Sequence, residues 1–266
     1  MQYKKNRMRI ITLINDWKQD PLYITQIYGA FLNIASNIQI VNITPDIKNY
    51  DNARAAFVLR KSFAFYPAGT IHFNFIDDLS NYKNYLIAKH KEQYIVSPDN
   101  GFLSLAIGKK IEELYLFPKS DETFAKIFDY SAILQIIIDE KTKGLLSADK
   151  MKDKYFPQPV FKDNSIIAHI LYIDSYGNLI TNLTKKKFVE AIANKGFKII
   201  LRSSSSKINF ISDNYEKIES GDLFAVFNVG NLLEIGQKGM NLANLMNYNV
   251  LGAIRIEIFD KEPSIF

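Results

Sequence analysis

The sequence predicts two domains of different class, an α/β domain with a mostly parallel sheet over 1–157 and a β-barrel domain over 163–266. In the first half, apolar strand-like runs alternate with segments of helical period, which is typical of a parallel α/β layer. In the second half, short runs rich in strand-forming residues dominate, as in a small barrel or sandwich. Between them lies the charged segment Lys150–Lys162 with Pro157 and Pro159, which predicts a linker.

The first half begins with the apolar run Arg9–Ile14, which predicts a buried strand ending at Asn15 and Asp16. Asp20 and Pro21 then provide an N-cap and a first-turn proline for a helix. The other elements expected in this half are strands over 38–43, 70–76, 85–88, 94–96 and 113–117, and helices over 51–65 and 121–139.

The second half is expected to contain one helix among several short strands. The helix is predicted over 185–193. The strands are predicted over 166–173, 197–202, 208–211, 223–227, 232–235 and 250–259.

Composition excludes several classes of site. The chain of 266 residues has no cysteine, so disulfides, thiolate metal sites and a cysteine nucleophile are excluded. Its three histidines are not spaced like a pair of metal ligands, so we expect no metal. The net charge of +5 comes from scattered lysines, which indicates a solvated surface and no nucleic-acid partner.

No apolar run approaches the roughly 18 residues that a membrane span needs. The apolar run near the N-terminus is too short for a signal peptide. We therefore expect a cytoplasmic protein with no membrane partner.

Carboxylates follow two of the predicted strands. Asp16 can accept hydrogen bonds from both vicinal hydroxyls of a ribose, or it can satisfy the backbone of its own turn. Asp77 and Asp78 follow the strand over 70–76; adjacent residues point to opposite faces, so at most one of them faces a site. The alternative is a pair of solvated loop carboxylates.

The string Pro98-Asp99-Asn100-Gly101 predicts a tight turn, because Asn-Gly permits positive φ. Its functional interpretation places Asp99 and Asn100 at the mouth of the same cleft. The chain has neither a P-loop nor a G-x-G-x-x-G pattern, which favours a nucleoside without phosphates as ligand.

A polar cluster in the second half is a further candidate. Asn178 can pair with an adenine edge, Tyr176 can stack on a purine, and Asp174 can bind an ammonium group. Asn182 lies in the same cluster. The alternative is a turn between strands with a tyrosine in the core.

In order along the chain, these strings resemble the S-adenosyl-L-methionine hydroxide adenosyltransferases, the group that also includes the fluorinase and chlorinase. Residues 65–77 resemble the string "FPxGTVHxxVVD", 97–103 resemble "xPDNGLL", and 173–183 resemble "IDxFGNxxTN". Residues 13–29 resemble the opening strand and helix. Asn228–Ala243 is a looser match to a segment containing "LEIA".

The resemblance implies a homotrimer in which the nucleoside ligand lies between the N-terminal domain of one subunit and the barrel of a neighbour. It implies roles for six residues: Asp16 at the ribose hydroxyls, Tyr50 over the sugar or sulfonium, Ser80 in the loop after the strand, Asp174 at the methionine amino group, and Tyr176 and Asn178 at the adenine.

The hydroxide-using members carry an Asp, an Arg and a His that orient and activate water. Asp77 matches the first, but the Arg falls near Asn84, beside Lys83, and the His falls on Ala125. Asp77 is the expected base, with Lys126 or Lys83 as the replacement cation.

The sequence thus predicts slow hydrolysis of S-adenosyl-L-methionine to adenosine and L-methionine without a cofactor. The alternative is a non-catalytic member that binds adenosine or S-adenosyl-L-methionine as a sensor or scaffold. Halide transfer is disfavoured, because Lys126 and Asp77 fit a dry halide pocket poorly.

Overall fold

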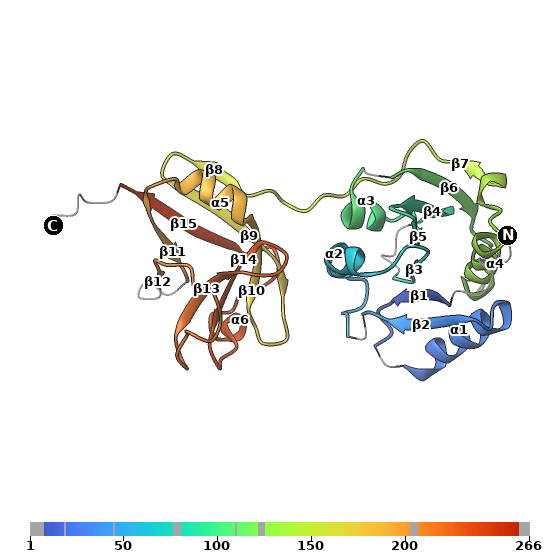
Figure 1. The fold of residues 1–266 in the computed structure, drawn as a ribbon, viewed down its shortest axis with the longest axis horizontal. Helices are drawn as coiled ribbons and strands as arrows, with labels where there is room; N and C mark the ends of the chain where they lie inside the picture. The colour runs from blue at the N-terminus through green and yellow to red at the C-terminus, as the bar shows by residue number, and fades with distance from the viewer. Residues whose placement is uncertain are drawn as a thin grey trace. The chain divides into compact units, whose positions relative to one another are not determined.

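The computed structural model describes residues 8–18, 20–44, 46–76, 81–109, 111–121, 126–202 and 207–260. The chain forms two compact units, which divide between Tyr155 and Phe156 (Figure 1).

The first unit is built on a seven-stranded sheet of order β2-β1-β3-β5-β4-β6-β7. β1 pairs in parallel with β2 and β3, and β3 pairs in parallel with β5, whereas the pairs β5–β4, β4–β6 and β6–β7 are antiparallel. Five strands therefore run one way and β4 and β7 the other, which confirms a mixed, mostly parallel sheet. The strands are β1 (Arg9–Ile14), β2 (Ile38–Asn42), β3 (Ile71–Asn74), β4 (Asn84–His90), β5 (Gln93–Pro98), β6 (Glu113–Pro118) and β7 (Leu146–Ser147).

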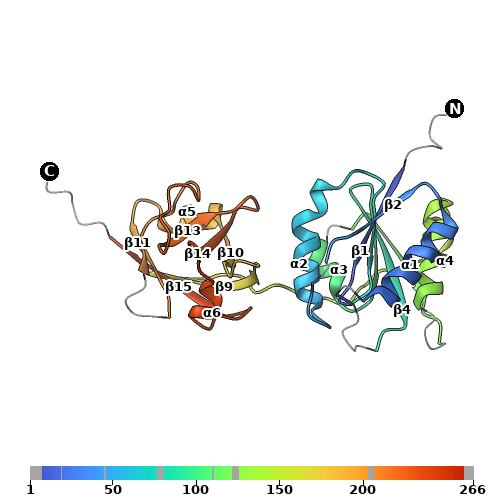
Figure 2. The ribbon, with the colours of Figure 1, turned by 90° about the horizontal axis from the view of Figure 1, so that it is seen from below.

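Helices cover both faces of this sheet. α1 (Pro21–Ile34) and α4 (Lys126–Ile138) pack together on one face, and α2 (Asn52–Ser62) and α3 (Phe102–Ile107) pack together on the other (Figure 2). Two short 3-10 turns follow α2 and α4, at Phe63–Phe65 and Thr142–Gly144.

The start of α1 is fixed locally, because the Asp20 side chain accepts a hydrogen bond from the Leu22 N–H and proline occupies the first turn. The helix buries Ile27 and Phe31, and the Phe31 ring lies 4.8 Å from that of Phe73 on β3. Burial of this apolar stripe against the sheet stabilises the helix. No helix in the described part of the chain is long and apolar enough to cross a bilayer.

His72 lies fully buried in β3 and is held as a neutral ring. Its Nδ1 lies 2.7 Å from Thr12 Oγ1 and its Nε2 lies 2.7 Å from Gln93 Oε1. Gln93 Nε2 donates to the carbonyls of Phe63 and Tyr66, so its oxygen faces the histidine as an acceptor. Burial lowers the pKa of His72 to about 4. This histidine is therefore part of the core.

The turn at 98–101 is structural. Asn100 is fully buried, and its amide donates to the Ile76 carbonyl and accepts from the Phe102 N–H. Asp99 accepts a hydrogen bond from the Lys152 N–H. Gly101 has φ +89°, and the Lys154 side chain occupies the space that a Cβ would need. The turn alternative is correct for Asp99 and Asn100, since both bind backbone groups of the first unit.

The second unit is an antiparallel barrel that is nearly closed. Its strand order is β12-β11-β15-β9-β10-β14-β13, and β8 pairs with β9. Beyond β12, the Ser212 N–H donates to the Ala225 carbonyl of β13 at 2.8 Å, which almost closes the barrel. The strands are β8 (Val160–Lys162), β9 (Ser165–Ile173), β10 (Leu179–Thr184), β11 (Gly196–Ile200), β12 (Lys207–Ile208), β13 (Leu223–Phe227), β14 (Leu232–Gln237) and β15 (Ala253–Phe259).

Two helices accompany the barrel, α5 (Lys185–Ile192) and the single turn α6 (Leu242–Leu245). Ile166, Ile170, Ile199, Leu233 and Ile256 are among the side chains that fill its interior. The predicted fold class, an α/β unit followed by a barrel, is confirmed.

Candidate functional site

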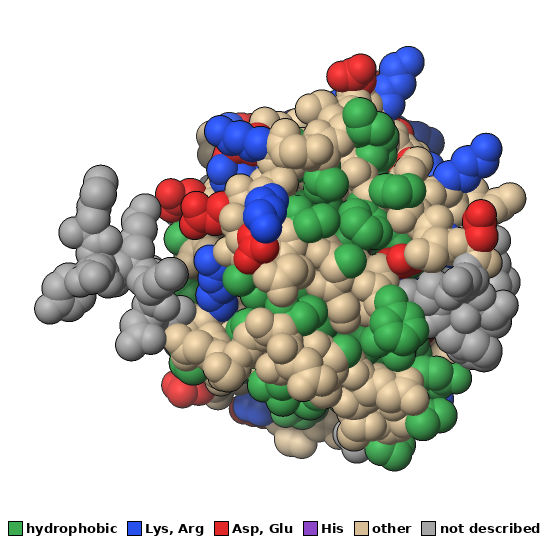
Figure 3. Space-filling model, turned by 90° about the vertical axis from the view of Figure 1, so that its right-hand side faces the viewer, with side chains coloured by type: hydrophobic (Ala, Val, Ile, Leu, Met, Phe, Trp, Pro, Cys, Tyr) green, Lys and Arg blue, Asp and Glu red, His purple; other side chains and the backbone are tan. Residues whose placement is uncertain are grey.

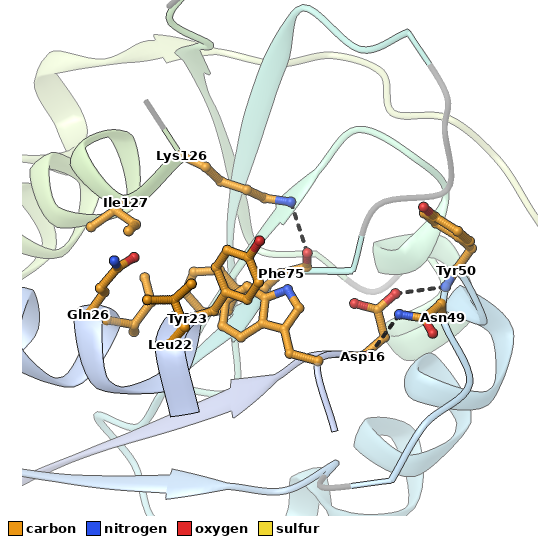
Figure 4. A pocket seen from close by; sticks show the side chains of 11 residues that line it. Asp16, Leu22, Tyr23, Gln26, Asn49, Tyr50, Phe75, Lys126 and Ile127 are labelled. Carbon is orange, nitrogen blue, oxygen red and sulfur yellow. Dashed lines mark hydrogen bonds between the residues drawn. The ribbon is translucent and has the colours of Figure 1, made fainter. Parts of the chain in front are cut away.

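The first unit contains a cavity of about 680 Å³ beside the segments that follow β1 and β3 (Figure 4). Ligands of α/β proteins commonly bind at such strand ends. The lining residues are Asp16, Trp17, Leu22, Tyr23, Gln26, Ile27, Asn49, Tyr50, Phe75, Lys126 and Ile127.

Asp16 contributes a buried, hydrogen-bonded carboxylate to this cavity. It is 5% exposed, and its Oδ2 accepts a hydrogen bond of 2.7 Å from the Tyr50 N–H. Tyr50 adopts a left-handed backbone conformation with φ +66°, just before Asp51 caps α2. Asn49 Nδ2 donates to the Asp16 carbonyl. Among the described residues, the hydrogen-bond partner of the carboxylate is thus a distant segment and not its own turn.

The turn that carries Asp16 is fastened to the end of β2. Asn15 Nδ2 donates to Asn42 Oδ1 at 3.0 Å, and the Asn15 N–H donates to Thr44 Oγ1 at 2.8 Å. Asn15 Oδ1 in turn accepts from the Trp17 N–H. Asp16 is therefore held between two residues whose own positions are fixed, which preorganises the carboxylate.

Aromatic rings form one wall of the cavity. The Trp17 ring lies 5.1 Å from that of Phe75 and 5.6 Å from that of Tyr23. Phe75 is buried and lies 4.4 Å from the ring of Tyr130 on α4. Such faces attract cationic groups and exclude water, which strengthens electrostatic contacts nearby.

Lys126 contributes a cation to the same cavity. Its Nζ donates to the Phe75 carbonyl at 2.8 Å. Figure 4 shows Asp16 with Asn49 and Tyr50 on one side of the cavity and Lys126 on another. Lys83 is exposed and does not line this cavity. Asp77, Ser80 and Ala125 lie outside the described residues.

The second unit has its own cavity, of about 570 Å³, at the turn between β9 and β10. Asp174 Oδ1 accepts from the N–H groups of Tyr176 and Asn178, at 2.9 and 2.8 Å. Gly177 has φ +84°, and the Asn241 side chain occupies the space that a Cβ would need. Asp174 therefore organises its own turn as well as lining the cavity.

A buried carboxylate, Glu234, lies beside this turn and is 5% exposed. Its Oε1 accepts from Tyr215 Oη at 2.6 Å and from Asn178 Nδ2 at 3.2 Å, and its Oε2 accepts from Asn228 Nδ2 at 3.1 Å. Asn178 Nδ2 also donates to Asp174 Oδ2 at 3.0 Å. Burial and the bond to Glu234 raise the pKa of Tyr215 far above its usual range.

Neither carboxylate of this cavity is neutralised by a lysine or arginine of the described ranges. Lys238 lines the cavity, but its Nζ donates to the carbonyls of Tyr215 and Ile218. The cavity is therefore suited to a ligand that carries hydrogen-bond donors or a positive charge.

Tyr176 is 77% exposed, so it is not the core tyrosine that the structural alternative required. It lines the cavity together with Asp174 and Asn178, the two residues predicted to act with it. Asn182 faces elsewhere: it accepts from the His169 N–H and donates to the Pro157 carbonyl.

Sequence reasoning did not single out Trp17, Tyr215 or Glu234 as site residues. The resemblance contained a signal for two of them. Trp17 directly follows Asp16 within residues 13–29, which resemble the opening strand and helix, and Glu234 lies within Asn228–Ala243, the looser match to the segment containing "LEIA". Tyr215 had no such signal, because it lies in an irregular segment between β12 and β13.

Two family models match the chain. The model for the N-terminal domain of S-adenosyl-L-methionine hydroxide adenosyltransferases matches residues 11–139, and that for the C-terminal domain matches residues 168–255. The chain belongs to the S-adenosyl-L-methionine hydroxide adenosyltransferase family. In the described part of the chain, no cluster of three His, Cys, Asp or Glu side chains could hold a metal ion.

A curated relative is the (R)-S-adenosyl-L-methionine hydrolase of Methanocaldococcus jannaschii. The two are 27% identical over an alignment of 268 positions, which covers 93% of this chain and 95% of the relative. An uncharacterized conserved protein of Thermotoga maritima shares the fold, with a TM-score of 0.78 and 17% identity over 94% of this chain and 99% of that one. A conserved hypothetical protein of Thermus thermophilus does so with a TM-score of 0.72 and 16% identity, over 95% and 100% of the two chains.

Proposed function

We propose that the protein hydrolyses S-adenosyl-L-methionine to adenosine and L-methionine. The observation that carries the proposal is the buried Asp16, whose carboxylate accepts from the Tyr50 N–H and whose main-chain carbonyl accepts from Asn49, in an aromatic cavity of a chain of this family. A fixed carboxylate in such surroundings suits the paired hydroxyls of a ribose.

The reaction is a substitution at C5′ of the ribose. The oxygen of a water molecule forms a bond to C5′ while the C5′–sulfur bond breaks. The electron pair of the breaking bond moves to the sulfonium sulfur, which becomes the neutral thioether of methionine. One proton of the water leaves to a base. Because the sulfonium is already a good leaving group, the site must mainly align the reactants, exclude bulk water and accept a proton. We assign the base to Asp77 and the neighbouring cation to Lys126, which lines the cavity.

The same ligand assigns roles to the other candidates. Tyr50 covers the sugar, and we assign Ser80 a substrate-binding role. The residues of the second unit act at the ends of the ligand, with Asp174 at the methionine amino group and Tyr176 stacked on the purine. Asn178 contacts the base edge.

We further propose that the chain assembles as a homotrimer, with the ligand between one subunit's first unit and a neighbour's barrel. The surface of α1 supports assembly, because its fourteen residues include no charge and Leu22, Tyr23 and Leu32 are exposed. On the side where α1 and α4 lie, hydrophobic side chains gather with few charges between them (Figure 3). Extensive exposed apolar surface is typical of interfaces. Light scattering tests this: a trimer supports the arrangement, and a monomer contradicts it.

Turnover is expected to be slow, because asparagine and alanine stand at positions 84 and 125, where the resemblance places the arginine and histidine that activate water. The same departure favours a second candidate function, a non-catalytic member that binds adenosine or S-adenosyl-L-methionine as a sensor or scaffold.

Incubation with S-adenosyl-L-methionine followed by chromatography for adenosine separates the two functions. Each sulfonium epimer is tested alone, since the name of the curated relative points to the (R) form as the first substrate. Adenosine above the protein-free sample supports the hydrolase. Tight adenosine binding with no product from either epimer supports the binder.

A further inference from the structure

The cavity of the second unit contains an amide whose orientation is fixed from both sides. Asn178 Nδ2 donates to Asp174 Oδ2 at 3.0 Å and to Glu234 Oε1 at 3.2 Å. A primary amide has two N–H donors, so both are used inside the protein. Carboxylates only accept hydrogen bonds. A rotation of the amide by 180° would therefore place Asn178 Oδ1 against the carboxylate oxygens of Asp174 and Glu234, which is unfavourable.

The oxygen of the same amide is the atom that remains for a ligand. Asn178 Oδ1 accepts no hydrogen bond from the described residues, and it is not among their buried polar atoms that lack a partner. Gly236 lies against this oxygen and leaves room for it. A Cβ at Gly236 would lie 2.2 Å from Oδ1, so a side chain there would displace or cover it.

We infer that Glu234 is a positioning residue. Together with Asp174 it fixes the orientation of the Asn178 amide, so that Asn178 presents its oxygen as an acceptor to the edge of a bound base and has no N–H group left to donate. This inference rests on the proposed function, because it concerns the nucleoside that the site binds. It names the feature that the base must present, a hydrogen-bond donor such as the exocyclic amino group of a 6-aminopurine.

The acceptor-only geometry differs from the usual bidentate contact of an asparagine with adenine, in which the amide accepts from N6 and also donates to N7. Here the N7 partner is absent from Asn178, since both N–H groups are used. A 6-oxopurine presents an oxygen to Oδ1, which leaves two acceptors opposed and costs affinity. Asn178 therefore selects at position 6 and offers no donor to position 7.

Replacing Glu234 by glutamine tests the positioning role, because a glutamine amide has only one accepting end. Asn228 cannot turn to accommodate it, since its Oδ1 accepts from the Gly230 and Leu232 N–H groups. The amino group of the introduced glutamine would then face Asn178 and Tyr215. The tyrosine hydroxyl can rotate to accept, whereas Asn178 loses one of the two acceptors that fixed its amide, so only Asp174 still opposes the orientation with N–H groups toward the cavity.

The experiment is calorimetric titration of the full-length protein with adenosine, 7-deazaadenosine and inosine. For the natural protein we expect adenosine and 7-deazaadenosine to bind within about threefold of each other and inosine at least about tenfold more weakly. In Glu234→Gln the inosine-to-adenosine ratio of Kd values should fall to about threefold or less. The matched control is Tyr215→Phe, which removes a donor to the same oxygen but keeps the carboxylate. It should shift both Kd values by one common factor and leave the ratio unchanged.

Loss of 7-deazaadenosine binding, or equal binding of inosine by the natural protein, would overturn the acceptor-only site. An inosine-to-adenosine ratio of Kd values that is unchanged in Glu234→Gln would overturn the role of Glu234. Thermal melting confirms that the variant is folded. If the natural protein binds no nucleoside, the proposed function fails and this inference fails with it. If it binds adenosine without selectivity, only the inference fails.

Discussion

Each of the two cavities contains an aspartate, and the two aspartates differ in the hydrogen bonds that hold them. Asp16 in the first unit receives its hydrogen bond from Tyr50, a residue of another segment, and its surroundings are aromatic. In the second unit, one oxygen of Asp174 accepts hydrogen bonds from the backbone of its own turn, and the other accepts from the Asn178 side chain. A second carboxylate, that of Glu234, accepts from the same Asn178 side chain. The first cavity therefore presents one carboxylate among aromatic rings, whereas the second presents two carboxylates whose oxygens already accept hydrogen bonds from the protein.

This difference indicates where ligand affinity and selectivity come from. A preorganised carboxylate in apolar surroundings makes strong contacts with hydroxyl groups, so the first cavity should supply most of the binding energy. A network whose donors are used internally can discriminate through its one open atom, so the second cavity should supply selectivity. The chain's single tryptophan, Trp17, lines the first cavity and reports on that unit alone.

The largest expected effect is on the acid stability of the first unit. Because the folded pKa of His72 is about 4 and the unfolded value is 6.5, the neutral ring stabilises the fold fully above pH 6.5. This contribution, about 3 kcal/mol, is lost as the pH falls from 6.5 to 4. Urea unfolding followed by Trp17 fluorescence at several pH values measures it.

A His72→Gln variant should lack this part of the pH dependence, even if it is less stable at every pH. The matched control is His169→Gln on β9 of the second unit, which should leave the Trp17 transition unchanged. A natural protein whose first unit is equally stable at pH 6.5 and 4 would contradict the account of the buried histidine.

Removing the carboxylate of the first cavity should give the next largest effect. Asp16→Ala should weaken adenosine binding by about 1.5–3 kcal/mol, the range for a hydrogen bond to a charged group. Titration followed by Trp17 fluorescence measures the change. Asp20→Ala is the control, because that aspartate caps α1 at an exposed site and should change stability without changing affinity. Unchanged affinity in Asp16→Ala would remove the first cavity from the site.

Restoring the water-activating groups should raise turnover. Ala125→His alone should give little, because a lone imidazole without its cationic neighbour is not positioned. Together with Asn84→Arg it should raise kcat by about 10²-fold, and by more than the product of the single changes, as expected for groups that act as a unit. Single-turnover rates measure this.

A matched variant controls for added charge. Gln135→Arg, on an exposed position of α4, combined with Ala125→His should give no such gain. Equal gains with either arginine, or strictly multiplicative gains, would show that the two groups do not act together.

The smallest expected effect concerns the two lysines proposed as the replacement cation. Lys126→Met should lower kcat by about tenfold, because Lys126 lines the first cavity beside the Phe75 carbonyl. Lys83→Met should leave kcat within about twofold of the natural value, because Lys83 is exposed and lies outside that lining. The opposite order would reassign the cation to Lys83.

Much of the fold could be predicted because its strands and helices are marked locally. β1 and β13 have the predicted bounds, and the helix expected over 51–65 forms as α2 and the turn that follows it. The helix α3 was missed. It is short and five of its six residues are buried, so it shows no amphipathic period, and its N-cap residue, Gly101, has no capping side chain. β10 was also missed, because polar residues such as Thr181 and Asn182 interrupt its apolar pattern.

The site was predictable only where a residue type and a motif coincide. Asp16 and Tyr50 do line one cavity, and Asp174, Tyr176 and Asn178 do line another. The hydrogen bonds that use both N–H groups of Asn178 were not predictable. They depend on Glu234, which the fold brings to Asn178 from another strand, and no local pattern encodes such a meeting.

The most direct test of the central claim is a single-turnover incubation of stoichiometric protein with (R)-S-adenosyl-L-methionine in ¹⁸O-labelled water, analysed by mass spectrometry. Stoichiometric protein makes a slow rate visible, and the label reports which oxygen bonds to C5′. The account predicts adenosine with one ¹⁸O atom at its 5′ oxygen and L-methionine without label, and less of both products with Asp16→Ala. Absence of adenosine above the protein-free sample, or adenosine without the label, would contradict hydrolysis by direct attack of water.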